Sequence, residues 1–192
     1  MGMANDYLDQ IRSMSSFVET QVSDMPDDLF GKRPGPSLNP ISFSYFHLLR
    51  VWDLDLNWII KGQGPQGDAW HRGGFAEKAG YSPDGKGMRG LGIGTGFTDS
   101  DVDEMNISRS VLREYQQQLL AETEEYLNGA DDAELNREVA PLPNAPDRPA
   151  TCAQRLQHTI SHSWSHTGEL RYAKGMFGIH DPSYPGTSGA AS

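Results

Sequence analysis

Four long stretches of this chain carry apolar residues at helical spacing, and none shows the alternation typical of a strand. They run from about residue 5 to 24, from 40 to 61, from 100 or 108 to 128, and from 151 to 177. The first shows the pattern most clearly, because its apolar residues recur every three or four positions and so share one helix face: Tyr7, Ile11, Met14, Val18, Val22 and Met25. Amphipathic helices must bury these faces against one another. The pattern therefore predicts an all-α, up-and-down-type four-helix bundle, or a variant with one long crossover.

Capping residues mark where these helices should begin. The second stretch opens with Asn39 and Pro40, a favourable N-cap followed by a residue preferred at the first helical position. Ser100 or Ser108 could cap the third helix, and Thr151 could cap the fourth. Proline-rich and glycine-rich connections separate the four stretches, as expected for loops.

Glycine is concentrated between the second and third predicted helices, where residues 61–98 hold twelve of the 21 glycines. A long stretch of this kind is usually a functional loop or a disordered one. We predict a single bundle over residues 1–178, with a glycine-rich insertion at 61–98 and a flexible tail at 179–192. We expect the insertion to fold over the bundle near the candidate site or to reach a partner subunit. Four aromatic residues would anchor it by burial: Trp70, Phe75, Tyr81 and Phe97.

Charge and cysteine content exclude several classes of protein. The chain has 16 Lys and Arg residues against 26 Asp and Glu, a formal charge of -10. This balance argues against a nucleic-acid binder and against docking on an anionic membrane, and no apolar stretch is long enough to span a bilayer. The single cysteine excludes an intrachain disulfide framework and a Cys-rich zinc site. No signal-peptide pattern opens the chain, so we expect a cytoplasmic protein.

The fourth predicted helix carries three of the six histidines, His158, His162 and His166. Each four-residue step advances about one turn, so the three rings leave the same face of the helix. Adjacent members have β-carbons roughly 6 Å apart, which suits two imidazoles on one metal ion. The outer two are about 12 Å apart along the axis and cannot share one ion comfortably. The spacing therefore leaves two pairs open, His158 with His162 or His162 with His166.

A second helix must complete such a site, and His47 is the candidate because it lies within the apolar stripe of the second helix. A buried imidazole needs a polar partner. From the sequence, that partner is a backbone carbonyl, a carboxylate such as Asp53 or Asp55, or a metal ion shared with the fourth helix. His71 lies in the glycine-rich region, from which it could supply a fourth ligand.

Two stretches of the chain resemble the DinB/YfiT-like superfamily of four-helix-bundle metalloproteins. In one, LFGKRPGPSLNPISFSYFHLLRV, an Arg-Pro connection precedes a helix that carries one histidine. In the other, HTISHSWSHTGELRYAKGMFG, spaced histidines are followed by a glycine and a polar residue. The resemblance implies a metal triad of His47, His162 and His166, with His158 one turn away as a pocket residue. The chain departs from most relatives in its long glycine-rich region.

The resemblance also implies a function. Three neutral imidazoles leave a divalent ion, zinc or nickel, with an open position, where a thiol would be deprotonated. Known members of the superfamily include S-transferases and isomerases that use low-molecular-weight thiols. The resemblance thus implies a metal-dependent thiol S-transferase or isomerase acting on an electrophilic substrate, in a homodimer. No catalytic side chain is predicted.

Several side chains are candidates for the substrate pocket and for support of the ligands. Arg50 and Arg171 could each hold a cosubstrate carboxylate, and His158 would stand beside them as a substrate-binding residue. Glu169 and Asp55 could orient a ligand ring by accepting its second N–H. Two other functions remain open: a hydrolase that uses a metal-bound hydroxide, and a non-enzymatic bundle that binds a small molecule or partner and carries a structural metal.

Overall fold

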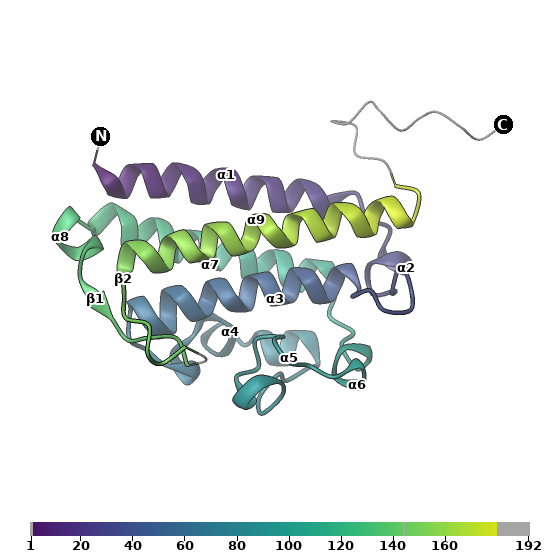
Figure 1. The fold of residues 1–192 in the computed structure, drawn as a ribbon. Helices are drawn as coiled ribbons and strands as arrows, with labels where there is room; N and C mark the ends of the chain where they lie inside the picture. Colours follow the sequence, from purple (N-terminus) through teal and green to yellow (C-terminus); the bar gives the residue numbers. More distant parts are fainter. Residues whose placement is uncertain (1, 144, 180–192) are drawn as a thin grey trace.

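Four long helices lie side by side in the computed structural model, which describes residues 2–143 and 145–179 (Figure 1). They are α1 (Met3–Ser23), α3 (Ile41–Asp53), α7 (Arg109–Gly129) and α9 (Cys152–Met176). Helix α1 packs against α7 and α9, and α3 packs against the same two helices. The predicted all-α bundle and the order of its helices are confirmed. The predicted tail, residues 179–192, lies outside the described residues apart from Ile179.

Side-chain caps fix the starts of the last two long helices. Ser108 caps α7 by accepting a hydrogen bond from the Val111 N–H. Thr151 and Gln154 form a capping box at the start of α9, in which each side chain accepts from the other residue's N–H. Both caps agree with the sequence prediction. The alternative start near Ser100 belongs to a separate short helix, α6 (Asp99–Asp103).

Helix α3 continues beyond Asp53 as a π-helix, η1 (Leu54–Ile60). Every residue of α3 and η1 is buried, because α7 and α9 pack against α3 on the bundle side and the glycine-rich segment covers the opposite side (Figure 1). Single π-turns inside helices are rare and often occur at functional sites. Here the segment buries Asp55 against α9, where the Thr159 hydroxyl donates a 3.0 Å hydrogen bond to its carboxylate.

The glycine-rich segment is not the structureless loop that its composition suggested. It contains α4 (Ala69–Arg72), α5 (Phe75–Ala79) and two 3-10 turns, η2 (Pro65–Gly67) and η3 (Met88–Gly90). Helix α5 is flanked by Gly74 and Gly80, both in the left-handed region that glycine tolerates. Trp70 and Phe75 are fully buried and Tyr81 nearly so, whereas Phe97 is half-buried. Aromatic burial therefore holds the segment against α3 and α7.

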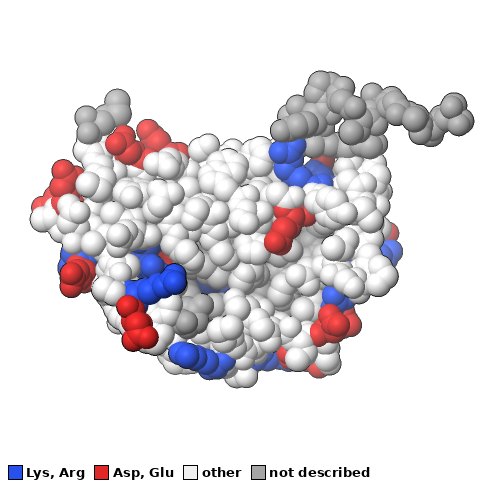
Figure 2. Space-filling model, in the orientation of Figure 1, with Lys and Arg blue, Asp and Glu red and all other residues white. Residues whose placement is uncertain are grey.

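The remaining elements close the ends of the bundle. They are α2 (Asp27–Phe30), α8 (Asp132–Leu135) and a short antiparallel pair, β1 (Glu138–Val139) with β2 (Ala150–Thr151). No helix of the described residues is long and apolar enough to cross a membrane. Figure 2 shows that charged side chains on the face in view lie mainly toward its edges, and that the band over α1 and α9 carries few of them.

Candidate metal centre

Three histidine rings meet between α3 and α9. The ring centroid of His47 lies 5.0 Å from that of His162 and 4.7 Å from that of His166, and the centroids of His162 and His166 are 4.4 Å apart. One ring nitrogen from each histidine lies within 4.8 Å of the other two. Helix α9 thus contributes the pair at i and i+4, and α3 contributes the third ring from the facing helix. These three residues could hold a metal ion.

Hydrogen bonds at the far side of two rings select which nitrogen faces the cluster. His47 Nδ1 lies 2.5 Å from the Ile93 carbonyl oxygen, and His166 Nδ1 lies 2.8 Å from Glu169 Oε2. Because these oxygens only accept, each Nδ1 carries the proton in the neutral ring and Nε2 carries the lone pair. The Nε2 atoms of His162 and His166 are 3.2 Å apart. Metal-binding histidines commonly show this arrangement of inner lone pair and outer N–H donor.

The surroundings keep two of these imidazoles neutral. Burial lowers the pKa of His47, and the Ile93 carbonyl offsets only part of that shift. Burial, followed by the neighbouring His47 and His166, lowers the pKa of His162 to about 2. Neutral imidazole is the form that binds metal. The donor set therefore fits a divalent ion, and nitrogen donors of this kind suit zinc, nickel, copper and iron alike.

A cavity of about 300 Å³ opens beside the cluster. Helix α3 contributes Phe43 and Ser44 to its wall, α9 contributes Glu169, and both His47 and His166 reach its surface. A smaller cavity of about 230 Å³ continues from it and shares Ser44 and Glu169. The described residues that line these two cavities include no Lys or Arg; the charged ones are Asp99 and Glu169.

His158 lies next to the triad without joining it. Its ring centroid is 5.6 Å from that of His162, and its Nδ1 lies 2.6 Å from Asp55 Oδ2. Asp55 is fully buried, and burial raises its pKa although the hydrogen bond from His158 opposes that shift. Asp55 therefore orients a histidine, as the sequence suggested, but the one that it orients is His158.

The structure does not bring the two predicted substrate-binding arginines to the cavity. Arg50 is 1% exposed and pairs with two carboxylates of its own chain, Asp68 at 2.8 Å and Asp53 at 3.4 Å. The Arg171 guanidinium lies over the Phe17 ring on α1, 5.9 Å from its centroid. Neither arginine is among the described residues that line the cavities.

The suggested fourth ligand, His71, is held elsewhere. Its Nδ1 lies 2.6 Å from Asp68 Oδ1 and its Nε2 lies 3.1 Å from Asp84 Oδ1. It is not part of the histidine group. Among the described residues, the candidate metal site therefore has three protein ligands.

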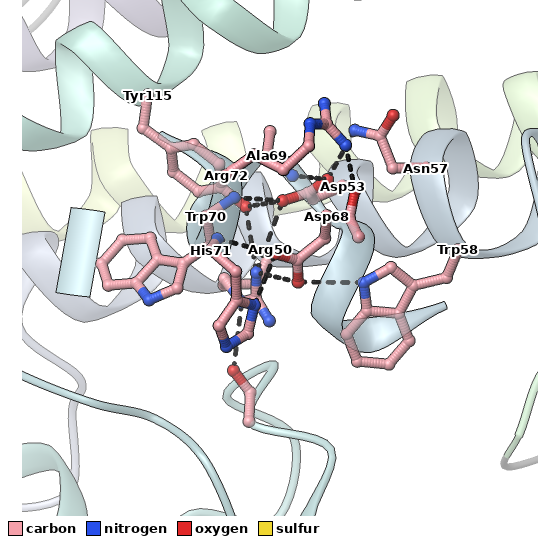
Figure 3. Close-up of polar contacts among 12 residues, drawn as sticks. Arg50, Asp53, Asn57, Trp58, Asp68, Ala69, Trp70, His71, Arg72 and Tyr115 are labelled. Atoms are coloured by element: carbon pink, nitrogen blue, oxygen red, sulfur yellow. Dashed lines mark hydrogen bonds and ion pairs between the residues drawn. The ribbon is translucent and has the colours of Figure 1, made fainter. Parts of the chain in front are cut away.

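A second buried polar cluster surrounds Arg50, and Figure 3 shows its members converging from α3, α7 and the glycine-rich segment. Asp53 accepts hydrogen bonds from the Ala69 and Trp70 backbone N–H groups and from the Tyr115 hydroxyl. Asp68 accepts from the Trp58 indole N–H in addition to Arg50. We call this set of six residues the arginine cluster: Arg50, Asp53, Trp58, Asp68, Trp70 and Tyr115.

Charge pairing and burial act against each other in the arginine cluster. Burial raises the pKa of Asp53 more than the nearby Arg50 lowers it. At Asp68, burial also raises the pKa, but Arg50 and the hydrogen bonds from His71 outweigh it and leave the pKa below its ordinary value. Asp68 is thus the stronger counter-ion of the guanidinium.

Two residues beside the candidate metal centre were not predicted from the sequence. The carbonyl of Ile93 is the polar partner of His47. The backbone of Gly94, with a φ of 94°, approaches the same ring closely. A Cβ at Gly94 would lie 2.8 Å from His47 Nδ1. The concentration of glycine was the one sequence signal for this close approach, and it did not identify a position.

Comparison with known proteins agrees with this architecture. A family model described as the DinB superfamily matches residues 9–170. A crystal structure of a conserved protein from Enterococcus faecalis superposes with a TM-score of 0.66 at 16% identity, covering 92% of this chain and 97% of that one. At this identity the likeness shows the fold alone. None of the curated proteins matches the chain significantly.

Proposed function

The chain belongs to the DinB superfamily, and we propose that it is a metal-dependent thiol S-transferase or isomerase whose divalent ion is held by His47, His162 and His166. The observation that carries this proposal is the set of three ring nitrogens within 4.8 Å, beside a cavity large enough for a small molecule. A bound divalent ion would supply the positive charge that lowers the pKa of a thiol and holds it as the nucleophilic thiolate.

The residues of the chain would present and orient the reactants. Glu169 and the Ile93 carbonyl hold His166 and His47 in the tautomer that directs Nε2 inward. Phe43 and Phe97 give the cavity apolar walls, and Ser44 with Asn39 offers hydrogen bonds. His158 lies at the neighbouring turn of α9, partly exposed beside His162.

The cavity lining favours particular cosubstrates. Its charged side chains, Asp99 and Glu169, are both carboxylates. A carboxylate on the thiol would meet like charges there, whereas an amine or hydroxyl group would not. We therefore expect cysteamine or 2-mercaptoethanol to bind more tightly than thioglycolate, which carries a carboxylate.

The proposal is tested with cobalt-substituted protein, because a thiolate bound to cobalt gives a sulfur-to-metal charge-transfer band. Titration with each of the three thiols measures its affinity, and consumption of thiol with a panel of electrophiles measures turnover. We expect the band and the turnover to appear in the intact protein and to disappear in His162→Ala. Equal turnover in metal-free protein would contradict the proposal.

The same experiment separates the alternatives. Turnover of esters or amides without added thiol would favour a hydrolase with a metal-bound hydroxide as nucleophile. Stoichiometric metal with neither a thiol band nor any turnover would favour a binding protein with a structural ion.

A further inference from the structure

We propose that Gly92, Ile93 and Gly94 form a backbone clamp on His47 and that Arg50 is the positioning residue that holds this clamp in place. In this arrangement the glycine-rich segment is the outer support of the metal centre, since it fixes the ring of the one ligand that comes from α3. The inference rests on the metal-binding part of the proposed function.

The clamp touches His47 through two backbone features. The Ile93 carbonyl accepts a hydrogen bond from His47 Nδ1 at 2.5 Å in a buried setting. Gly94 packs against the same ring so closely that a Cβ there would lie 2.8 Å from Nδ1 and 3.0 Å from Cγ. Any larger residue must push the ring or the segment aside, and the φ of 94° already disfavours one.

The Ile93 side chain anchors the middle of the clamp. It is 4% exposed and belongs to a small apolar cluster with residues of α3 and η1: Val51, Leu54, Trp58 and Ile59. The preceding Gly92 has a φ of 65°, and a Cβ there would lie 2.8 Å from the Pro83 carbonyl oxygen. The backbone at positions 92–94 is therefore confined on both of its sides.

Arg50 connects the clamp to the rest of the protein. Its Nε donates a 3.2 Å hydrogen bond to the Gly92 carbonyl, one residue before the carbonyl that holds His47. Arg50 and His47 are three residues apart on α3, so they leave the same side of the helix and reach the same short segment.

The arginine cluster keeps the guanidinium in one position. Nη1 donates to Asp68 at 2.8 Å, and the group lies 5.7 Å from the Trp58 ring and 5.8 Å from the Trp70 ring. A planar guanidinium held by a carboxylate and two aromatic rings has little freedom to turn. Figure 3 shows Asp68 and Trp58 beside Arg50. Because the rest of the guanidinium is fixed in this way, the Arg50 Nε–H points at the Gly92 carbonyl.

The consequence of the clamp concerns the metal. An outer acceptor on Nδ1 fixes the tautomer and the direction of Nε2, and loss of such a partner typically costs about 10- to 100-fold in metal affinity. We expect Gly94→Ala to weaken cobalt binding by about that factor, because the new methyl group displaces the His47 ring. Gly80→Ala is the matched control, since Gly80 has a comparable φ of 61° with no atom within 4 Å of its would-be Cβ.

A second variant tests Arg50 itself. Arg50→Lys keeps a positive charge beside Asp68 but has no Nε–H for the Gly92 carbonyl. We expect cobalt affinity to fall roughly 10-fold and the d–d spectrum of the cobalt protein to change, whereas Arg12→Lys, at an exposed ion pair with Glu124, should leave both unchanged. Cobalt affinity is measured by competition with a chelating dye, on variants whose cooperative unfolding shows that they are folded.

A measurement on the unaltered protein does not depend on any variant folding. In the zinc-loaded protein, the ring N–H proton of His47 should give a downfield NMR signal that exchanges slowly with water, because its acceptor is buried. Absence of zinc and cobalt binding by the intact protein would overturn the proposed function. Normal metal binding together with a rapidly exchanging His47 ring proton, or with full affinity in Gly94→Ala, would overturn the clamp alone.

Discussion

Helix α3 contributes to two polar clusters, one buried and one half-buried, that differ in how their polar atoms are paired. In the arginine cluster, the guanidinium of Arg50 faces the carboxylates of Asp53 and Asp68, and further donors come from Trp58 and Tyr115. In the histidine cluster, formed by His47, His162 and His166, the inward nitrogens of the three imidazoles face one another.

This difference separates a cluster whose groups are paired within the chain from one that could bind a metal ion. In the arginine cluster, Arg50 is paired with Asp68, and the second carboxylate, Asp53, accepts hydrogen bonds from Tyr115 and from two backbone N–H groups. Three imidazoles in one place direct ring nitrogens at one another without a counter-charge in the described cluster, and burial lowers the pKa values of His47 and His162. A buried polar group without a partner costs free energy, and a divalent cation would relieve that cost. The comparison predicts that breaking the first cluster costs folding stability and reaches metal affinity only through the contact of Arg50 with Gly92, whereas breaking the second acts on metal binding directly.

The largest expected effect comes from breaking the arginine cluster. Arg50→Met would leave two buried carboxylates without their cation, and we expect the free energy of unfolding to fall by about 3–5 kcal/mol. Arg12→Met removes an arginine from an exposed ion pair with Glu124 and should cost about 1 kcal/mol or less. Denaturant unfolding of metal-free protein measures both changes. Equal losses in the two variants would contradict a structural role for the cluster.

Removing a metal ligand should act on metal affinity instead. We expect His162→Ala to weaken zinc binding by more than the roughly 10- to 100-fold that loss of an outer partner costs, and to remove the thermal stabilisation that zinc gives the intact protein. Tyr172→Ala is the control, because Tyr172 is 61% exposed on α9 and is not part of the histidine group. Isothermal titration and melting curves with and without zinc supply the measurements. A comparable loss in both variants would mean that the zinc site lies elsewhere.

The two clusters also differ in how far the sequence predicted them. The i, i+4 spacing on α9 is local, so it correctly predicted that His162 and His166 leave one face. His47 was a candidate partner from its place in the apolar stripe of the second helix, with a carbonyl or a carboxylate as the alternative. The choice of His162 with His166 over His158 with His162 needed the family resemblance, because it depends on how two helices pack. The path of the glycine-rich segment is tertiary information, and for that reason the Ile93 carbonyl and the burial of Arg50 were not predicted.

The helices also show that local features can be predicted from the sequence, whereas features that depend on tertiary contacts cannot. Caps such as Ser108 and Thr151 act within a few residues of their own position, so the sequence predicted the start of α9 and limited the start of α7 to Ser100 or Ser108. The π-helix η1 contacts α9 and the 3-10 turn η2 of the glycine-rich segment, and contacts of this kind are not visible in a local sequence pattern. Apolar residues are frequent throughout Leu54–Ile60, so their spacing does not distinguish an α-helix from a π-helix.

A smaller effect would show whether hydrogen bonds as well as charges hold the arginine cluster. Tyr115→Phe removes the hydroxyl that donates to Asp53 at 2.6 Å, and we expect a loss of about 2 kcal/mol, because a buried carboxylate then lacks one donor. Tyr172→Phe is the matched control, since Tyr172 is 61% exposed and should change stability by a few tenths of a kcal/mol at most. No difference between the variants would mean that water replaces the lost donor at Asp53.

The smallest expected effect is on the pH dependence of the stability of the metal-free protein, which tests whether the histidine cluster is held unprotonated. The pKa values of His47 and His162 in the folded protein lie below the ordinary value of 6.5, so the unfolded chain binds more protons as the pH falls below 6.5. Stability is therefore complete above pH 6.5 and declines below it, by up to about 1.4 kcal/mol per pH unit for each imidazole. His162→Gln should reduce this slope by one imidazole's share. Denaturant unfolding between pH 5.5 and 7.5, with a chelator present, measures it. Identical slopes in the two proteins would mean that His162 accepts a proton in the folded state as readily as in the unfolded one, and the cluster would then not be held in its metal-binding form.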